Sequence, residues 1–97
     1  MLKIVQWRTG AARKYQAEFW YYESIRDGLG FDLELHVESC LDGIRLHPNF
    51  GTLVSNSVRR RIVKRFPFVV YYRVHKGWIE IVGFRSVLQK PLKRYSK

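Results

Sequence analysis

Hydrophobic positions along the 97-residue chain recur first with the period of a strand and then with that of a helix. Residues 2–7, LKIVQW, alternate in side-chain character and predict a first strand. Thr9 is placed to cap a helix over residues 11–27. The apolar stripe of this helix, at 3.6-residue spacing, consists of Ala11, Tyr15, Phe19 and Tyr22, flanked by Ala12 and Ile25. We expect this stripe to face a sheet.

A second helix is predicted over residues 31–47, after Gly28 and Gly30 interrupt the first pattern. Its apolar stripe consists of Leu33, Val37, Cys40 and Ile44. Pro48 ends the helix, and the sequence PNFGTLVSN is typical of an irregular connection. The two helices are therefore expected to form a hairpin.

Three more strands are predicted after this connection, over residues 57–64, 67–75 and 78–85. Gly77 supplies the positive φ that the tight link between the last two requires. The order predicts one α+β domain over residues 1–97, a two-layer sandwich of the form β-α-α-β-β-β. The helical hairpin packs on one face of a mainly antiparallel four-stranded sheet, with the first strand antiparallel beside the last. We expect a mobile basic tail from about residue 89.

Several classes of protein are disfavoured by the composition. The single cysteine, Cys40, cannot form an internal disulfide and is expected in the core, and no apolar run approaches a signal peptide or a membrane span. We therefore expect a soluble cytoplasmic protein that does not bind membranes. His36, His47 and His75 lack the paired spacing of a metal site, and the glycines form no phosphate-binding motif, so we expect no metal and no cofactor.

Charge is distributed unevenly along the chain, whose net charge is +10. Residues 1–48 hold six Lys/Arg and seven Asp/Glu, for a net −1, whereas residues 49–97 hold twelve and one, for a net +11. Solubility is usually served by mixed signs, so this segregation favours a polyanionic partner such as a nucleic acid or an acidic protein surface.

The basic residues are expected on the open face of the sheet. Period-two alternation sends Phe68, Val70, Tyr72 and Val74 towards the helices. The opposite set comprises Val69, Tyr71 and Arg73, together with Arg59, Arg61, Val63 and Arg65 from the preceding strand and Glu80, Val82 and Phe84 from the last strand. Arginines that neutralise phosphates beside exposed aromatic rings suit a single-stranded nucleic acid. The predicted anion-binding residues are Arg59, Arg61, Arg65, Tyr71, Arg73 and Arg85.

The segments EFWYYES, HPNFG, KRFPFVVYYRV and WIEIVGF, in this order, resemble the RelE/ParE superfamily of bacterial toxins. The resemblance covers nearly the whole chain, and its last two segments are the most telling. It implies a growth-arresting toxin of a type II toxin–antitoxin system, encoded with a cognate antitoxin that wraps it. A non-toxic basic nucleic-acid-binding module is the alternative outside the superfamily.

The superfamily contains two activities. RelE-like members are endoribonucleases that cleave mRNA on the ribosome, and resemblance to them assigns Arg61, Arg65 and Arg85 to the scissile phosphate. Tyr95 is then the remaining hydroxyl aromatic for proton transfer, with Pro91 near the place where these enzymes keep a Tyr or His. ParE-like members poison DNA gyrase, and they often have a His where this chain has Phe84. The FPFVVYYRV run and the long aromatic helix favour the ParE-like branch, so only the alternative branch implies an enzyme.

Four apolar residues fall outside the predicted stripes: Trp20, Phe31, Leu35 and Leu46. They fit either contacts between the two helices or an exposed groove in which an antitoxin segment docks. If all four are buried within one chain, the groove is excluded.

Overall fold

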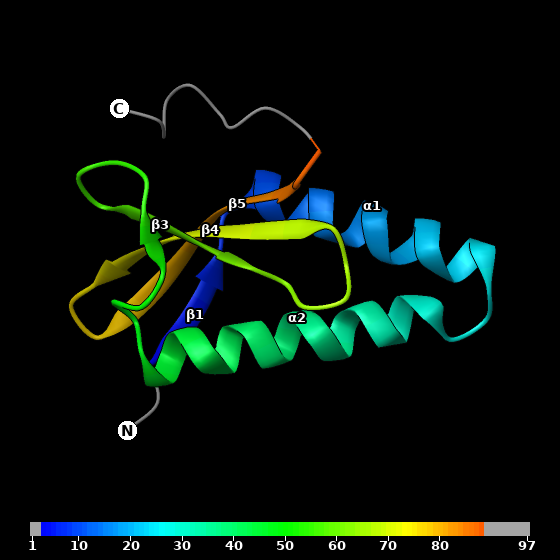
Figure 1. Cartoon of the computed structure of the whole chain (residues 1–97), viewed down its shortest axis with the longest axis horizontal. Coiled ribbons are helices and arrows are strands. Elements are labelled where there is room, and N and C mark those ends of the chain that lie inside the picture. The colour runs from blue at the N-terminus through cyan, green and yellow to red at the C-terminus, as the bar shows by residue number, and fades with distance from the viewer. Residues whose placement is uncertain (1–2, 89–97) are drawn as a thin grey trace.

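The computed structural model of the chain describes residues 3–88 and has two layers, a helical hairpin and a sheet (Figure 1). The helices are α1 (Thr9–Ile25) and α2 (Leu29–Leu46). The strands are β1 (Ile4–Trp7), β2 (Thr52–Leu53), β3 (Val58–Ile62), β4 (Phe68–His75) and β5 (Trp78–Ser86). The predicted α+β sandwich is confirmed, and the predicted mobile tail lies outside the described residues.

The sheet has the strand order β1-β5-β4-β3-β2 and is mixed, because β1 runs parallel to β5. The predicted antiparallel pairing of the first and last strands is wrong. Helix α2 returns past the start of α1 to the end of the sheet where β1 begins (Figure 1). Strand β3 starts at that end and runs in the same direction as β1. The chain then reverses into β4 and reverses again into β5, so β5 also runs in the direction of β1.

A fifth strand, β2, lies in the segment that was predicted to be an irregular connection, and it pairs antiparallel with β3. Helix α1 begins at Thr9, so this residue is inside the helix, and the N-cap residue Arg8 makes no side-chain cap hydrogen bond. Gly77 has a φ of 84°, as the link between β4 and β5 requires. Among residues 3–88, neither helix is both long enough and apolar enough to cross a bilayer.

The main core lies between α2 and the sheet. All four residues of the predicted α2 stripe are buried, namely Leu33, Val37, Cys40 and Ile44. They belong to one cluster with Phe68, Val70 and Tyr72 of β4 and with Ile79, Ile81 and Phe84 of β5. In α1 only Ala11 is fully buried, Tyr15 and Tyr22 pack partly against the core, and Ile25 is exposed. The hairpin therefore rests on the sheet mainly through α2.

The arginines of β3 lie on the opposite faces of the sheet from those predicted. Arg59 pairs with Tyr72 and Arg61 pairs with Val70, both of which belong to the main core. Residues directly opposite one another on neighbouring strands share a face, so Arg59 and Arg61 lie on the helix side of the sheet. Arg60 lies on the open side.

The reason for this register is the burial of valines on both sides of β3. Val63, predicted on the open face, belongs to the main core, whereas Val58 belongs to a second buried cluster on the other face. Phe84 was also predicted on the open face but is buried in the main core. A bulge in β5 at Val82, opposite the junction of Tyr71 and Tyr72, shifts the alternation there by one residue.

Two side chains hold the connection between α2 and β2. The Tyr72 hydroxyl donates a hydrogen bond to the carbonyl of Pro48 at 2.7 Å and accepts one from the backbone N–H of Gly51 at 3.1 Å. Arg59 Nη1 donates to the carbonyls of Asn49 and Gly51, at 3.1 and 2.9 Å. A buried core tyrosine thus fixes the course of a loop with no regular structure of its own.

Glu80, the only acidic residue after position 42, joins three elements. Its carboxylate accepts hydrogen bonds from Arg8 Nε at the start of α1 and from Arg73 Nη1 of β4, the latter at 3.4 Å, and it lies 2.8 Å from His75 Nε2. Burial raises the pKa of Glu80, but the hydrogen bonds from His75 and Arg8 and the charges of Arg8 and Arg73 outweigh burial and hold this pKa below its ordinary value.

We predict that Tyr72→Phe lowers the free energy of unfolding by about 1–2 kcal/mol, because the Gly51 N–H and the Pro48 carbonyl lose their partner in a buried place. Urea unfolding followed by circular dichroism measures this change. Tyr21→Phe is the matched control, since Tyr21 is exposed, and it is expected to change stability by less than about 0.5 kcal/mol. Equal effects of the two substitutions would contradict the role of the Tyr72 hydroxyl.

We predict that Glu80→Gln lowers the free energy of unfolding at pH 7 by about 1 kcal/mol, a modest value because the Arg8 side chain is half exposed. A carboxyl with a lowered folded pKa stabilises the fold above its unfolded pKa of about 4.3, and this contribution disappears as the pH falls through the folded value. The difference between wild type and Glu80→Gln should therefore be fully present at pH 7 and should shrink as the pH falls below about 4.3.

The control for this substitution is Glu18→Gln, which breaks the pair with Lys14 on the surface of α1. An i,i+4 pair contributes only about 0.2–0.5 kcal/mol. A loss at pH 7 as small as that of the control, or one that does not shrink in acid, would mean that Glu80 does not act through its charge.

Candidate functional site

The arginines that were predicted to form one anion-binding face are divided between two sides of the sheet. Arg59 and Arg61 lie on the helix side, whereas Arg73 and Arg85 lie on the open side, and Arg59 donates to two backbone carbonyls. Arg73 donates to Ser57 Oγ at 3.1 Å and pairs with Glu80. Arg59 and Arg73 are thus largely occupied by intramolecular contacts.

Two further residues of the predicted anion-binding set do not form a stacking surface. Tyr71 lies on the open face as predicted, but only 4% of it is exposed, so its ring is not a platform for bases. Arg65 is exposed in the link between β3 and β4, where it has a φ of 68°. The predicted basic face studded with exposed aromatic rings is therefore wrong in its composition.

The residues of the predicted ribonuclease site are not brought together. Arg61 pairs with Val70 and Arg85 pairs with Val69, and successive residues of a strand point to opposite faces. The side chains of Arg61 and Arg85 thus leave the sheet in opposite directions. Tyr95 lies outside the described residues. The catalytic role of these residues stays a prediction.

Arg61 lies in a small cleft between α2 and β3 that the sequence did not indicate. Its guanidinium group lies against Gly43, where an added Cβ would come within 2.8 Å of Nη2. The cleft, about 140 Å³ in volume, is lined by His36, Ser39, Cys40, Arg61, Ile62 and Lys64. Among residues 3–88, Arg61 Nη1 is buried without a hydrogen-bond partner. Two cationic side chains and a hydroxyl could hold a carboxylate or a phosphate here.

Cys40, at the base of this cleft, is a core side chain as predicted. Burial raises the pKa of its thiol to about 11, and this effect outweighs the opposing influence of the Arg61 charge. A thiol of this kind stays protonated at neutral pH and is a poor nucleophile. His36, His47 and His75 are engaged with Asp32, Phe50 and Glu80, respectively. Among residues 3–88, no three metal-binding side chains come together.

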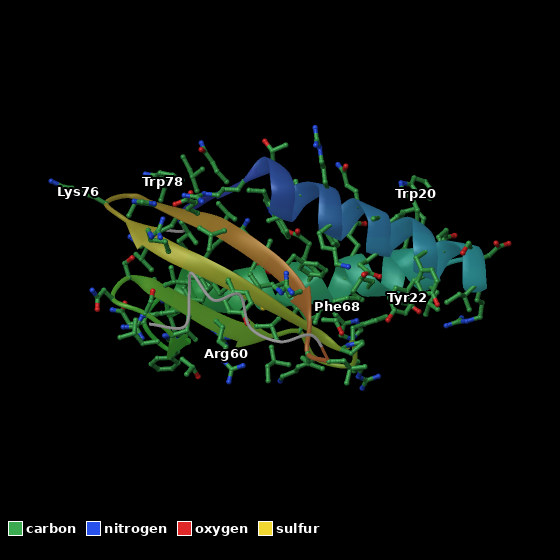
Figure 2. The ribbon with its side chains drawn as sticks, turned by 90° about the horizontal axis from the view of Figure 1, so that it is seen from above. Trp20, Tyr22, Arg60, Phe68, Lys76 and Trp78 are labelled. Carbon is green, nitrogen blue, oxygen red and sulfur yellow. The ribbon has the colours of Figure 1, made fainter. Side chains whose placement is uncertain are left out.

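The four apolar residues outside the predicted stripes are all exposed. The exposed fractions are 66% for Trp20, 58% for Phe31, 66% for Leu35 and 62% for Leu46. The hypothesis that these side chains are buried in contacts between the two helices is therefore excluded. Figure 2 shows Trp20 on the outer side of α1, at the opposite border of the molecule from Arg60.

Three of these residues lie at the turn of the helical hairpin, and the fourth does not. Phe19 makes edge-to-face contacts with both Trp20 and Phe31, each with 5.0 Å between ring centroids, and so joins α1 to α2. Leu35 follows Phe31 by one turn of α2. Leu46 lies eleven residues after Leu35, or about 16 Å along the helix at 1.5 Å per residue. Trp20, Phe31 and Leu35 form one surface, named the hairpin patch below.

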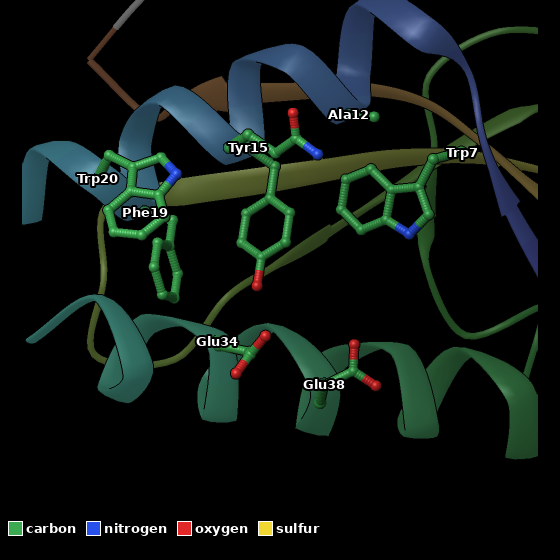
Figure 3. Close-up of a pocket in the computed structure, with 8 residues that line it drawn as sticks. Trp7, Ala12, Tyr15, Phe19, Trp20, Glu34 and Glu38 are labelled. Carbon is green, nitrogen blue, oxygen red and sulfur yellow. The ribbon is translucent and has the colours of Figure 1, made fainter. Parts of the chain in front are cut away.

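A groove of about 400 Å³ adjoins the hairpin patch between α1 and α2 (Figure 3). It is lined by Trp7, Ala12, Tyr15, Gln16, Phe19, Trp20, Glu34 and Glu38. The sequence indicated only its Trp20 end, because Tyr15 and Phe19 of α1 were expected to face the sheet and the remaining walls come from β1 and from the polar side of α2. Figure 3 shows the Tyr15 side chain extending from α1 towards α2, where Glu34 and Glu38 stand.

Comparisons with known proteins indicate the fold of the chain. No protein-family model matches the sequence, and no curated protein matches it. Among solved structures, one chain described as "Chromosomal ParDE TA system from P. aeruginosa" superposes with a TM-score of 0.70 at 19% sequence identity. The match covers 88% of this chain and 96% of that chain. The fold that the resemblance implied is confirmed, and the chain has the RelE/ParE fold, with two helices on one face of a mixed five-stranded sheet.

Proposed function

We propose that this protein is the toxin of a type II toxin–antitoxin system, acting in the cytoplasm. In this proposal it is ParE-like, inhibits DNA gyrase and is neutralised by a cognate antitoxin. The supporting likeness is in fold, to a chain whose structure is described as a ParDE system. Toxicity, the target and the antitoxin itself are parts of this proposal.

The observation that carries the proposal is the hairpin patch. Trp20, Phe31 and Leu35 are each more than half exposed, and they neighbour the groove between α1 and α2. Exposed apolar surface of this kind beside a concave site marks a protein interface. An antitoxin that covers the patch would remove it from water and would fill the groove.

Gyrase inhibition fits the arrangement of arginines better than RNA cleavage does. Cleavage requires cations that converge on one phosphate together with an acid and a base, but Arg61 and Arg85 leave opposite faces of the sheet. Ribosome-dependent mRNA cleavage remains the second candidate, and the observation that favours it is Arg61 Nη1, which has no hydrogen-bond partner among residues 3–88.

We predict that induced expression arrests growth and that the purified protein inhibits DNA supercoiling by gyrase. The protein should leave mRNA on programmed ribosomes intact. Arg61→Ala and Arg85→Ala variants, each checked for folding by circular dichroism, separate the candidates. Cleavage of ribosome-bound mRNA that both variants lose, with gyrase unaffected, would replace the first candidate by the second. Normal growth of cells that make the folded protein would contradict both toxic functions and leave a non-toxic nucleic-acid-binding module.

We predict that Trp20→Ala and Leu35→Ala each weaken antitoxin binding at least tenfold, because central apolar anchors contribute about 1.4 kcal/mol or more to such interfaces. The binding partner in this assay is the product of the small open reading frame beside the toxin gene, and calorimetry gives the dissociation constant. Leu53→Ala on β2 is the matched control, since Leu53 is also exposed but belongs to the far edge of the sheet. Wild-type affinity of both hairpin-patch variants would show that this patch is not the interface.

A further inference from the structure

The groove between α1 and α2 contains two carboxylates in a strongly basic protein. Glu34 and Glu38 lie four residues apart on α2 and point into the groove (Figure 3). Among residues 3–88, neither carboxylate forms an ion pair, although the chain has 18 Lys and Arg residues. Two adjacent acids that pair with no cation of the described part of the chain make this groove attractive to a cation from outside the chain.

Aromatic rings form the walls around these carboxylates. Trp7 stacks on Tyr15 with 5.1 Å between ring centroids, and Trp20 meets Phe19 edge to face at 5.0 Å. The face of an indole or phenol ring attracts a cation through its quadrupole, and Arg is the commonest cation in such contacts. Glu34 and Glu38 are exposed, so water partly screens their attraction for a bound cation, and the ring faces add to this attraction.

The Tyr15 hydroxyl gives a third reason to expect a donor in the groove. Its oxygen is buried and, among residues 3–88, has no hydrogen-bond partner. Burial, together with the charges of Glu34 and Glu38, raises the pKa of Tyr15 to about 12, so the hydroxyl is neutral at physiological pH. Because this oxygen has almost no access to water, a guest reaches it only when the side chains that cover it move aside. A guest with N–H groups would then satisfy its lone pairs, whereas an apolar guest would leave them unpaired.

We propose that this groove receives an arginine or lysine side chain of the antitoxin, whose neighbouring apolar residues cover the hairpin patch. The inference rests on the proposed function and adds the chemistry of the partner. A protein segment is favoured over a free small cation because the groove shares Trp20 with the hairpin patch, so one chain can occupy both. Arginine is favoured over lysine, because a planar guanidinium can stack on a ring while it donates to Glu34, Glu38 and Tyr15.

Nuclear magnetic resonance titration with N-acetyl-arginine amide tests this chemistry directly. We expect saturable shifts of the Trp7 and Trp20 indole N–H signals, with a dissociation constant of about 1–10 mM for one isolated side chain. The neutral N-acetyl-glutamine amide should not produce them. Absence of saturation with the arginine probe, or equal shifts with the glutamine probe, would overturn the proposal. Shifts that saturate when the protein alone is concentrated would instead assign the groove to a second copy of this chain.

A double variant with Glu34→Gln and Glu38→Gln should weaken binding of the arginine probe at least fivefold. The matched control is the double variant with Asp32→Asn and Asp42→Asn, which removes two negative charges from the same helix outside the groove lining. If the two double variants weaken binding equally, the effect comes from the net charge of the protein and not from the groove, and the proposal is overturned. Tyr15→Phe should weaken binding by a smaller factor, because it removes one acceptor and keeps the ring.

The antitoxin complex separates failure of this inference from failure of the proposed function. If the Glu34/Glu38 double variant binds the antitoxin as tightly as wild type while Trp20→Ala does not, the hairpin patch stands and the cation site is wrong. If the cell tolerates the folded protein without arrest, the proposed function fails, whatever the arginine probe shows.

Discussion

Burial of β4 on both of its faces is the constraint on which the rest of this structure depends. Val70 and Tyr72 belong to the core beneath the helices, while Val69 and Tyr71 belong to a second buried cluster on the other face. A shift of β3 by one residue against β4 would turn every side chain of β3 to the other face and take Val58 out of the second cluster, so the register admits no slip. This register decides which side of the sheet each arginine of β3 takes.

The division of the arginines has a chemical consequence. A run of three arginines along a strand looks like a single basic surface in the sequence, but alternation sends Arg60 to one side and its two neighbours to the other. On the helix side, Arg59 holds a loop and Arg61 lies against Gly43. The concentrated charge thus serves several separate contacts. The groove between the helices has the opposite sign, because Glu34 and Glu38 lie there without cationic partners among residues 3–88.

The helical parts of the fold could be predicted from the sequence, and the reasons are physical. The four apolar residues of the α2 stripe recur at helical spacing, and all four are buried. Gly77 has a positive φ, which marks a turn that few other residues can make. Strand β3 carries no comparable signal, since arginines fill both of its faces and only valines at its ends identify the core side. Strict alternation along β5 takes no account of the bulge at Val82 and therefore placed Phe84 on the wrong face. The groove was found only at Trp20, because Trp7, Tyr15 and Glu38 come from separate elements and meet only after folding.

The central claim is that the β3 register divides the arginine run between the two sides of the sheet. Nuclear Overhauser contacts in the isotopically labelled protein test it most directly, because they report which protons lie within a few ångströms of each other. The account predicts contacts between the Arg61 side chain and the α-protons of Gly43, and between the side chains of Arg60 and Tyr71. Contacts of Arg60 with Gly43 and of Arg61 with Tyr71 would contradict it.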